Sequence, residues 1–175
     1  MSSSAIIERD ASARAGRFVT DSAAETRALG AAFAAAAMPG DRIALIGDLG
    51  AGKTQLAKGF ATGLGVTEVV DSPSFTLMAE YEGRWPLFHQ DLYRLSGAHE
   101  IVASGLLDER QDQGVTLLEW ADRLDLRLDP YRLELRFAFA GEDGRIIESR
   151  CADAARHARY MHAGRAWEAT TRGDR

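Results

Sequence analysis

Apolar residues recur along this chain with two periods, and the local period predicts where strands and helices lie. Runs that fit buried or half-buried strands occupy residues 16–20, 42–46, 75–81, 85–93, 115–119, 131–140 and 145–149. Helical patterns occupy residues 22–37, 54–61, 96–111 and 152–169, and the first and last of these are rich in alanine. Glycine and proline separate most of the segments, and Gly105 interrupts the third helical one. Strands and helices that alternate in this way indicate an α/β fold.

The segment between the strand at 42–46 and the helix at 54–61 has the most specific pattern in the chain. It reads GDLGAGKT, which is Gly, four free positions, Gly, Lys and Thr, the pattern of a phosphate-binding P-loop. Its glycines let successive backbone N–H groups converge on phosphate oxygens, and the following helix directs its N-terminus at the same anion. Lys53 would contact the terminal phosphates, and the hydroxyl of Thr54 would bind Mg²⁺. The predicted nucleotide contacts are Gly47, Asp48, Gly50, Ala51, Gly52, Lys53, Thr54 and Gln55.

These features predict a single P-loop nucleotide hydrolase-type domain of the α/β class, in which helices flank a mixed sheet. The chain has 175 residues, of which 46% are hydrophobic, and this suits one soluble domain. Residues 1–15 are small and polar and are expected to be poorly ordered, residues 16–150 form the P-loop domain, and residues 151–175 form a basic helical extension. The chain shows no membrane span, no signal peptide and only one cysteine, so we expect a cytoplasmic protein.

Charge is distributed unevenly along the chain. The net charge is −5, although residues 151–175 carry five arginines against three acids. Nucleic-acid binding relies largely on Lys and Arg that neutralise phosphates, so this chain is not expected to hold RNA by itself. The basic extension contacts RNA or an acidic partner, or it is simply a solvated helix face, which is the more common reason for such a stretch. Every motif lies upstream of it, and removing it is expected to spare ATP binding.

A P-loop hydrolase needs a further carboxylate at a strand end, where it holds Mg²⁺ directly or through water. Asp91 ends the strand-like segment PLFHQD, and Glu119 ends the strand-like segment VTLLE. Glu119 is closer to the usual pattern, but both acids are candidates for catalysis and for the metal. His89 is the near-site imidazole, although a lone histidine on a strand is more often structural. Trp120 fits the core and the nucleotide side equally well.

Hydroxyl groups surround a proline between the P-loop helix and the next strand, where residues 72–76 read SPSFT. Such a segment suits a switch loop that senses the terminal phosphate or Mg²⁺ through Ser72, Ser74 and Thr76. An ordinary loop that enters a strand explains these residues equally well, and both interpretations remain open.

Taken together, these segments resemble one family. GDLGAGKT, then SPSFTL, HQDLYR and LEW occur in the order found in the TsaE (YjeE) family, the small bacterial P-loop ATPases required to make threonylcarbamoyladenosine in tRNA. The likeness spans residues 16–149. In two respects the chain departs from the family: Ser74 stands where the family usually has Thr, and residues 150–175 extend past the usual end.

The resemblance implies a role for each motif. Lys53 and Thr54 would serve phosphate and Mg²⁺, and residues 72–76 would form the switch segment. Asp91 would be a catalytic or water-orienting acid, and Glu119 would be a metal-side acid. The residues implied to approach the nucleoside are Ser22 and Ala23, at the start of the first helix, and Gly144 and Arg145, at a turn.

The resemblance also implies a weak, partner-dependent ATPase that uses ATP and Mg²⁺. It would associate with the TsaB–TsaD heterodimer, in which TsaD transfers the threonylcarbamoyl group to adenosine 37 of tRNA, and tRNA would be reached only through these partners. Two other functions remain open. A small-molecule kinase uses the same P-loop, although Arg94 and Arg110 are too scattered to form a basic lid. A nucleotide-dependent interaction protein would bind ATP without hydrolysing it.

Overall fold

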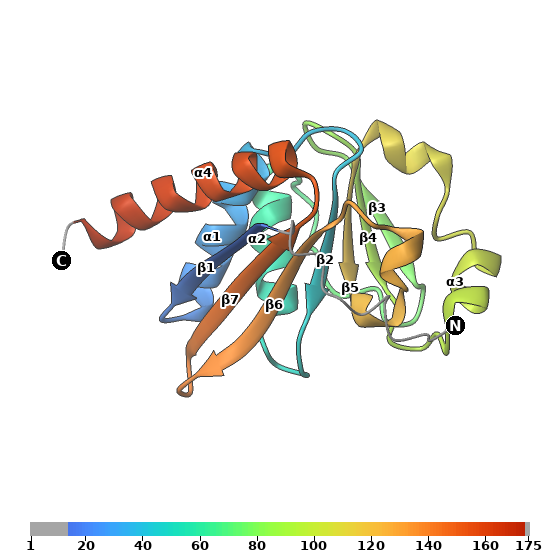
Figure 1. The fold of residues 1–175 in the computed structure, drawn as a ribbon, viewed down its shortest axis with the longest axis horizontal. Coiled ribbons are helices and arrows are strands. Elements are labelled where there is room, and N and C mark those ends of the chain that lie inside the picture. Colours follow the sequence, from blue (N-terminus) through green and yellow to red (C-terminus); the bar gives the residue numbers. More distant parts are fainter. Residues whose placement is uncertain (1–13, 174–175) are drawn as a thin grey trace, which may run out of the picture.

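The computed structural model describes residues 14–173, which form one mixed seven-stranded sheet with helices on both faces (Figure 1). The main elements are β1 (Arg14–Thr20), α1 (Ala23–Ala35), β2 (Arg42–Ile46), α2 (Lys53–Gly63), β3 (Met78–Tyr81), β4 (Leu87–Asp91), α3 (Ala98–Ala103), β5 (Val115–Glu119), β6 (Leu133–Ala140), β7 (Gly144–Cys151) and α4 (Ala154–Arg172). Short 3₁₀ helices cover Glu109–Gln113, Ala121–Arg123 and Leu126–Leu128. The predicted fold class, a mixed sheet flanked by helices, is confirmed.

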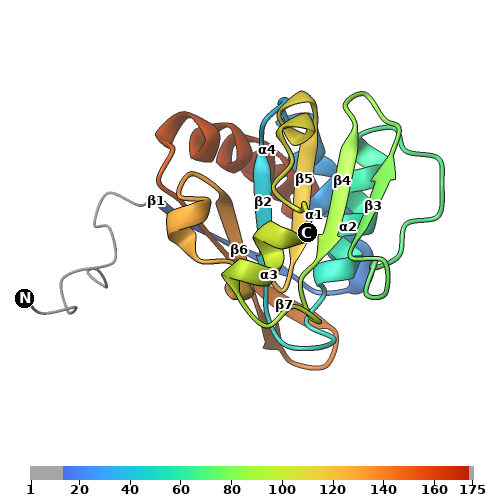
Figure 2. The ribbon, with the colours of Figure 1, turned by 90° about the vertical axis from the view of Figure 1, so that its right-hand side faces the viewer.

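The sheet is parallel at its centre and antiparallel toward both edges. Its strand order is β1-β7-β6-β2-β5-β4-β3. The pairs β6–β2, β2–β5 and β5–β4 are parallel, and the remaining pairs are antiparallel. Figure 2 shows β2, β5, β4 and β3 side by side in this order. Because parallel strands bring their carboxyl ends to one edge of a sheet, the residues that follow β2, β4 and β5 come together there.

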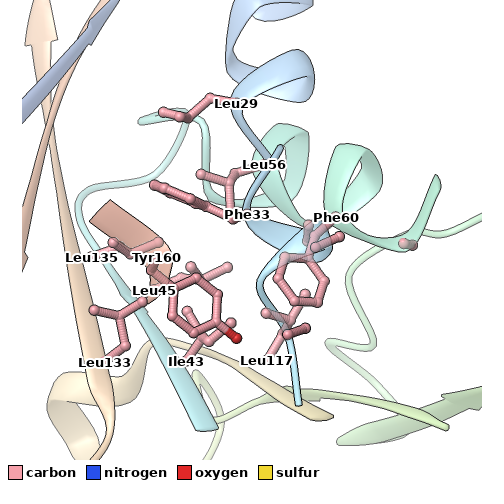
Figure 3. Packing of buried hydrophobic residues seen from close by; sticks show 14 of the residues in the cluster. Leu29, Phe33, Ile43, Leu45, Leu56, Phe60, Leu117, Leu133, Leu135 and Tyr160 are labelled. Atoms are coloured by element: carbon pink, nitrogen blue, oxygen red, sulfur yellow. The ribbon is translucent and has the colours of Figure 1, made fainter. Parts of the chain in front are cut away.

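Apolar side chains on the two faces of the sheet hold the layers together. On one face, Phe33 of α1 and both Leu56 and Phe60 of α2 are fully buried against leucines and isoleucines of the central strands (Figure 3). A Cβ atom at Gly59 of α2 would overlap the backbone of Arg27 in α1, so glycine allows these helices to approach closely. The other face carries a smaller cluster beneath α3 and the loops around it. This packing fixes α2, and with it the P-loop, against the sheet.

Three segments differ from the sequence-based expectation. The strand expected from residue 75 begins at Met78, because the N–H of Leu77 donates to the Pro73 carbonyl oxygen at 2.8 Å and closes a turn. The helix expected over residues 96–111 divides into α3 and a 3₁₀ helix around Gly105, whose φ is +76°. At the N-terminus, β1 begins at Arg14, which lies inside the segment 1–15 that was expected to be poorly ordered. Residues 1–13 lie outside the described part of the chain. Within residues 14–173, no helix is long and apolar enough to cross a membrane.

The C-terminal helix α4 is part of the core. Tyr160 is fully buried, and its ring lies edge-on to that of Phe33 with the centroids 5.9 Å apart. Its hydroxyl donates to Asp41 at 2.7 Å, and Arg156 and Arg159 donate to the same carboxylate at 2.9–3.0 Å. Asp41 directly precedes β2, which leads into the P-loop. Removing residues 151–175 would therefore expose apolar core residues and leave the buried Asp41 carboxylate without these partners. We expect the truncation to destabilise the chain rather than to spare ATP binding.

The buried Asp41 cluster allows a stability prediction. Burial raises the pKa of Asp41, but hydrogen bonds from Arg159, Tyr160 and the Met38 N–H outweigh it and hold the pKa below its usual range. A lowered folded-state pKa stabilises the protein above the unfolded-state pKa, and this stability is lost as pH falls through the folded value. We expect Asp41→Asn to lower the free energy of unfolding by about 3 kcal/mol at pH 7, since a buried charge pair is broken.

The difference between Asp41→Asn and wild type should shrink as pH falls below about 4, where the unfolded-state carboxyl becomes protonated. Denaturant unfolding between pH 7 and pH 3 measures it. Asp125→Asn is the matched control, because Asp125 pairs with Arg127 on the surface, and its effect should be much smaller. Equal losses in the two variants would contradict the central place given to Asp41.

Candidate nucleotide-binding site

A cavity of about 260 Å³ opens at the carboxyl ends of β2, β4 and β5. Asp91 ends β4 and Glu119 ends β5, and these two residues are direct partners in the parallel register. The cavity is lined by Leu49, Gly50, Ala51, Gly52, Lys53, Thr54, Gln55, Ser72, Ser74, Asp91, Glu119 and Trp120. The structure therefore brings the P-loop, both strand-end acids and part of the predicted switch segment to one place.

The P-loop has the backbone that its glycines predict. Gly50 and Gly52 have φ values of +77° and +104°, in the left-handed region that favours glycine. A Cβ atom at Gly47 would lie 3.0 Å from the side chain and backbone of Phe137, so this position also has little room for a side chain. Helix α2 begins at Lys53, and its N-terminus faces the cavity. Free backbone N–H groups at a helix start bind anions such as phosphate.

Lys53 is buried, and its side chain folds back onto the P-loop. Its Nζ donates to the carbonyl oxygens of Gly47 and Asp48 at 2.5 and 2.9 Å and lies 4.4 Å from the ring centroid of Trp120. Burial lowers the pKa of Lys53, and the nearby charge of Glu119 opposes this shift. A phosphate in the cavity would give this ammonium group a stronger acceptor than the two carbonyls.

The side chain of Glu119, at the end of β5, lies between Thr54 and His89. It is 2% exposed, and the Thr54 hydroxyl lies 3.2 and 3.3 Å from its two carboxylate oxygens. From beneath, the Nε2 of His89 lies 2.8 Å from Oε1. The Thr54 hydroxyl and the Glu119 carboxylate are thus neighbours, as oxygen ligands on one side of a single cation must be.

Asp91 is joined to the predicted switch segment. The hydroxyls of Ser72 and Ser74 donate to its Oδ2 at 2.6 and 3.1 Å, and the N–H of Tyr93 donates to Oδ1 at 2.8 Å. Thr76, the third predicted switch hydroxyl, is exposed and does not line the cavity. The neighbouring Phe75 is 81% exposed. These hydrogen bonds connect the segment to the buried strand-end acid, which is the contact that the switch interpretation requires.

The residues implied to approach the nucleoside do not line the cavity. Ser22 caps α1, where its Oγ accepts the Glu25 N–H at 3.1 Å, and Ala23 begins that helix. Arg145, which follows Gly144 at the start of β7, donates to the carbonyl oxygens of Ala51 and Gly50, each at 3.1 Å. Arg145 thus braces the loop from its outer side.

Two lining residues were left undecided or missed by the sequence analysis. Trp120 lines the cavity and has a φ of +56°, which is unusual for a bulky residue. The sequence signal that places Trp120 near the site is its position directly after Glu119. Leu49, at the exposed tip of the P-loop, is 85% exposed and is a free position in the motif, so no sequence pattern marks it.

The donor chemistry fits Mg²⁺ that binds together with phosphate. Thr54, Glu119 and Asp91 offer one hydroxyl and two carboxylates, whereas octahedral Mg²⁺ normally adds substrate phosphates and water to one or two carboxylates. No group of three or more His, Cys, Asp or Glu residues within the described chain could hold a metal by itself. The residues present therefore suit a nucleotide-bound cation.

Comparison with known proteins identifies the family. The family model described as "Threonylcarbamoyl adenosine biosynthesis protein TsaE" matches residues 20–147. The relative called tRNA threonylcarbamoyladenosine biosynthesis protein TsaE from Bacillus subtilis is 43% identical over 76% of this chain and 89% of its own length. The protein of the same name from Treponema pallidum is 35% identical over 75% of this chain and 97% of its own.

The fold agrees with this match. The crystal structure of Bacillus subtilis YdiB superposes with a TM-score of 0.74 at 38% sequence identity, covering 88% of this chain and 97% of that one. The P-loop, the two strand-end acids and the segment at residues 72–76 all lie inside the matched region. The chain belongs to the TsaE family.

Proposed function

We propose that this chain is an ATP-binding and ATP-hydrolysing subunit of the cytoplasmic machinery that makes threonylcarbamoyladenosine in tRNA, the pathway for which its relatives are named. The observation that carries the proposal is the meeting of Lys53, Thr54, Asp91 and Glu119 around one cavity at the carboxyl edge of the sheet. A phosphate-binding loop, a hydroxyl and two acids are the parts that phosphoryl transfer to water requires.

Each residue has a distinct part in this reaction. The N–H groups of the P-loop and Lys53 bind and orient the β- and γ-phosphates, while Thr54 and Glu119 hold the nucleotide-bound cation. When bound with the nucleotide, Mg²⁺ would supply positive charge that stabilises the charge developing on the phosphates as ADP leaves. Asp91 orients the attacking water and accepts its proton.

The switch follows from the partners of Asp91. Its Oδ2 is occupied by the hydroxyls of Ser72 and Ser74, so binding a water there and holding the switch segment compete. When ATP is bound and a water occupies this oxygen, residues 72–76 lose their contact with Asp91 and change conformation. The exposed Phe75 presents that change at the surface. A nucleotide switch acts only through a partner that reads its two states. We assign that role to the TsaB–TsaD pair, which would hold the tRNA that this acidic chain does not.

This proposal predicts weak ATP hydrolysis by the chain alone, faster hydrolysis with the TsaB–TsaD pair, and binding to the pair that depends on the nucleotide. Phosphate release and calorimetric binding in ATP, in ADP and without nucleotide measure these effects. Ser72→Ala should keep ATP binding but reduce the difference between the nucleotide states, because its bond to Asp91 is lost. Thr62→Ala is the control, since the Thr62 hydroxyl donates to the Lys58 carbonyl oxygen within α2.

Equal affinity for the pair in all three nucleotide states would refute the switch. A phosphorylated product in place of free phosphate would identify a small-molecule kinase, and ATP binding without turnover under any condition would identify a non-hydrolysing interaction protein.

A further inference from the structure

His89 lies directly beneath the candidate metal-side acid. It belongs to β4, its side chain is fully buried, and its Nε2 lies 2.8 Å from Oε1 of Glu119. We infer that His89 is a positioning residue, which holds the Glu119 carboxylate in the orientation needed for the nucleotide-bound cation. The inference rests on the proposed function and concerns how its site is built.

The register of the central strands creates this contact. In the parallel pair β4–β5, His89 is opposite Leu117, and Asp91 is opposite Glu119. Side chains two residues apart on a strand share a face, so His89 lies on the same face as both acids and one position deeper. The strand register therefore determines that the His89 ring lies next to the Glu119 side chain.

The hydrogen bonds define which atoms are fixed. A carboxylate oxygen only accepts, so His89 donates through Nε2 and the ring has its proton there. Nδ1 has no hydrogen-bond partner in the described part of the chain. Glu119 is thus the one polar group among the described residues that the ring bonds. Apolar residues surround the ring on this face, with Leu87 two positions earlier on β4 and Leu117 opposite it on β5.

The consequence concerns the orientation of the Glu119 carboxylate. The terminal torsion of a glutamate side chain is broad, so an unsupported carboxylate samples many orientations. With Oε1 tied to His89 from below, the carboxylate stays beside the Thr54 hydroxyl at the cavity wall, which lies 3.2 Å from Oε1 and 3.3 Å from Oε2. A neighbouring group that orients a metal ligand typically contributes 10- to 100-fold to metal affinity or activity, by order of magnitude.

The test is Mn²⁺ binding to the protein–ADP complex, followed by calorimetry, together with ADP binding in the absence of divalent metal. His89→Leu should weaken Mn²⁺ binding by about 10- to 100-fold while metal-free ADP affinity stays unchanged, because the P-loop is not touched. His89→Gln should regain most of the Mn²⁺ affinity, since its amide N–H reaches about where Nε2 lies. Gln90→Leu is the matched control: Gln90 is equally buried on the opposite face of β4, and its loss should leave Mn²⁺ affinity unchanged.

A wild-type Mn²⁺ affinity in His89→Leu overturns the inference, as does a Gln variant that binds Mn²⁺ no better than the Leu variant. If His89→Leu does not fold, His89→Gln is compared with the shorter His89→Asn: tighter Mn²⁺ binding by the Gln variant supports the inference, and equal binding overturns it. Wild-type protein–ADP that takes up no Mn²⁺ refutes the metal site in the proposed function itself, and that result is separate from a failure confined to the His89 variants.

Discussion

Lys53→Ala is expected to abolish ATP hydrolysis and to remove most of the ATP affinity while the protein remains folded. Lys53 is 5% exposed, and its ammonium group lies against the P-loop carbonyls. Phosphates in the cavity would therefore have a positive charge beside them where there is little water. A charged hydrogen bond of this kind is worth about 1.5–3 kcal/mol, which corresponds to a loss in affinity of at least about tenfold. Turnover falls further, because the same charge stabilises the transition state.

Calorimetric titration with ATP, phosphate release and a thermal melt measure these effects. Lys58→Ala is the control, because Lys58 lies on the same helix but pairs with Asp71 at the surface, 3.1 Å away. Both variants remove one positive charge from α2, so a difference between them reports the position of the charge. ATP binding of normal strength in Lys53→Ala would refute the assignment of the site.

Asp91→Asn and Glu119→Gln should each still bind ATP but hydrolyse it about 100-fold more slowly or worse, as expected when a positioned charge is lost near the phosphates. The amides preserve shape, so the fold is kept. The two variants should differ in one respect: Glu119→Gln should require more Mg²⁺, since Glu119 faces Thr54, whereas Asp91→Asn should leave the Mg²⁺ requirement closer to normal.

Phosphate release across a Mg²⁺ titration, with ATP binding measured separately, distinguishes the two acids. Glu80→Gln serves as the control, because Glu80 is an exposed acid on β3 that pairs with Arg110 at the surface. If both amide variants hydrolyse ATP at the wild-type rate, the two-acid site is wrong.

The sequence alone determined the features that local chemistry encodes. The P-loop was recognisable because a tight anion-binding turn needs glycine at set positions, and the structure places Gly50 and Gly52 in that backbone. Asp91 and Glu119 were recognisable because each stands at the end of a segment whose residues predict a strand. The mixed sheet followed from the order of the segments, since the P-loop strand requires parallel neighbours.

Only the tertiary structure decided what depends on residues distant in the chain. The bond from His89 to Glu119 exists because β4 and β5 align in one register. The bonds from Ser72 and Ser74 to Asp91 exist because the loop before β3 lies against the end of β4. The hydrophobic pattern of a strand indicates which face it buries, but the register also depends on which strands become neighbours, and only the folded sheet shows that. Helix α4 likewise read as a basic extension, yet its Tyr160 enters the core, where the chain can bury apolar surface and satisfy Asp41 together.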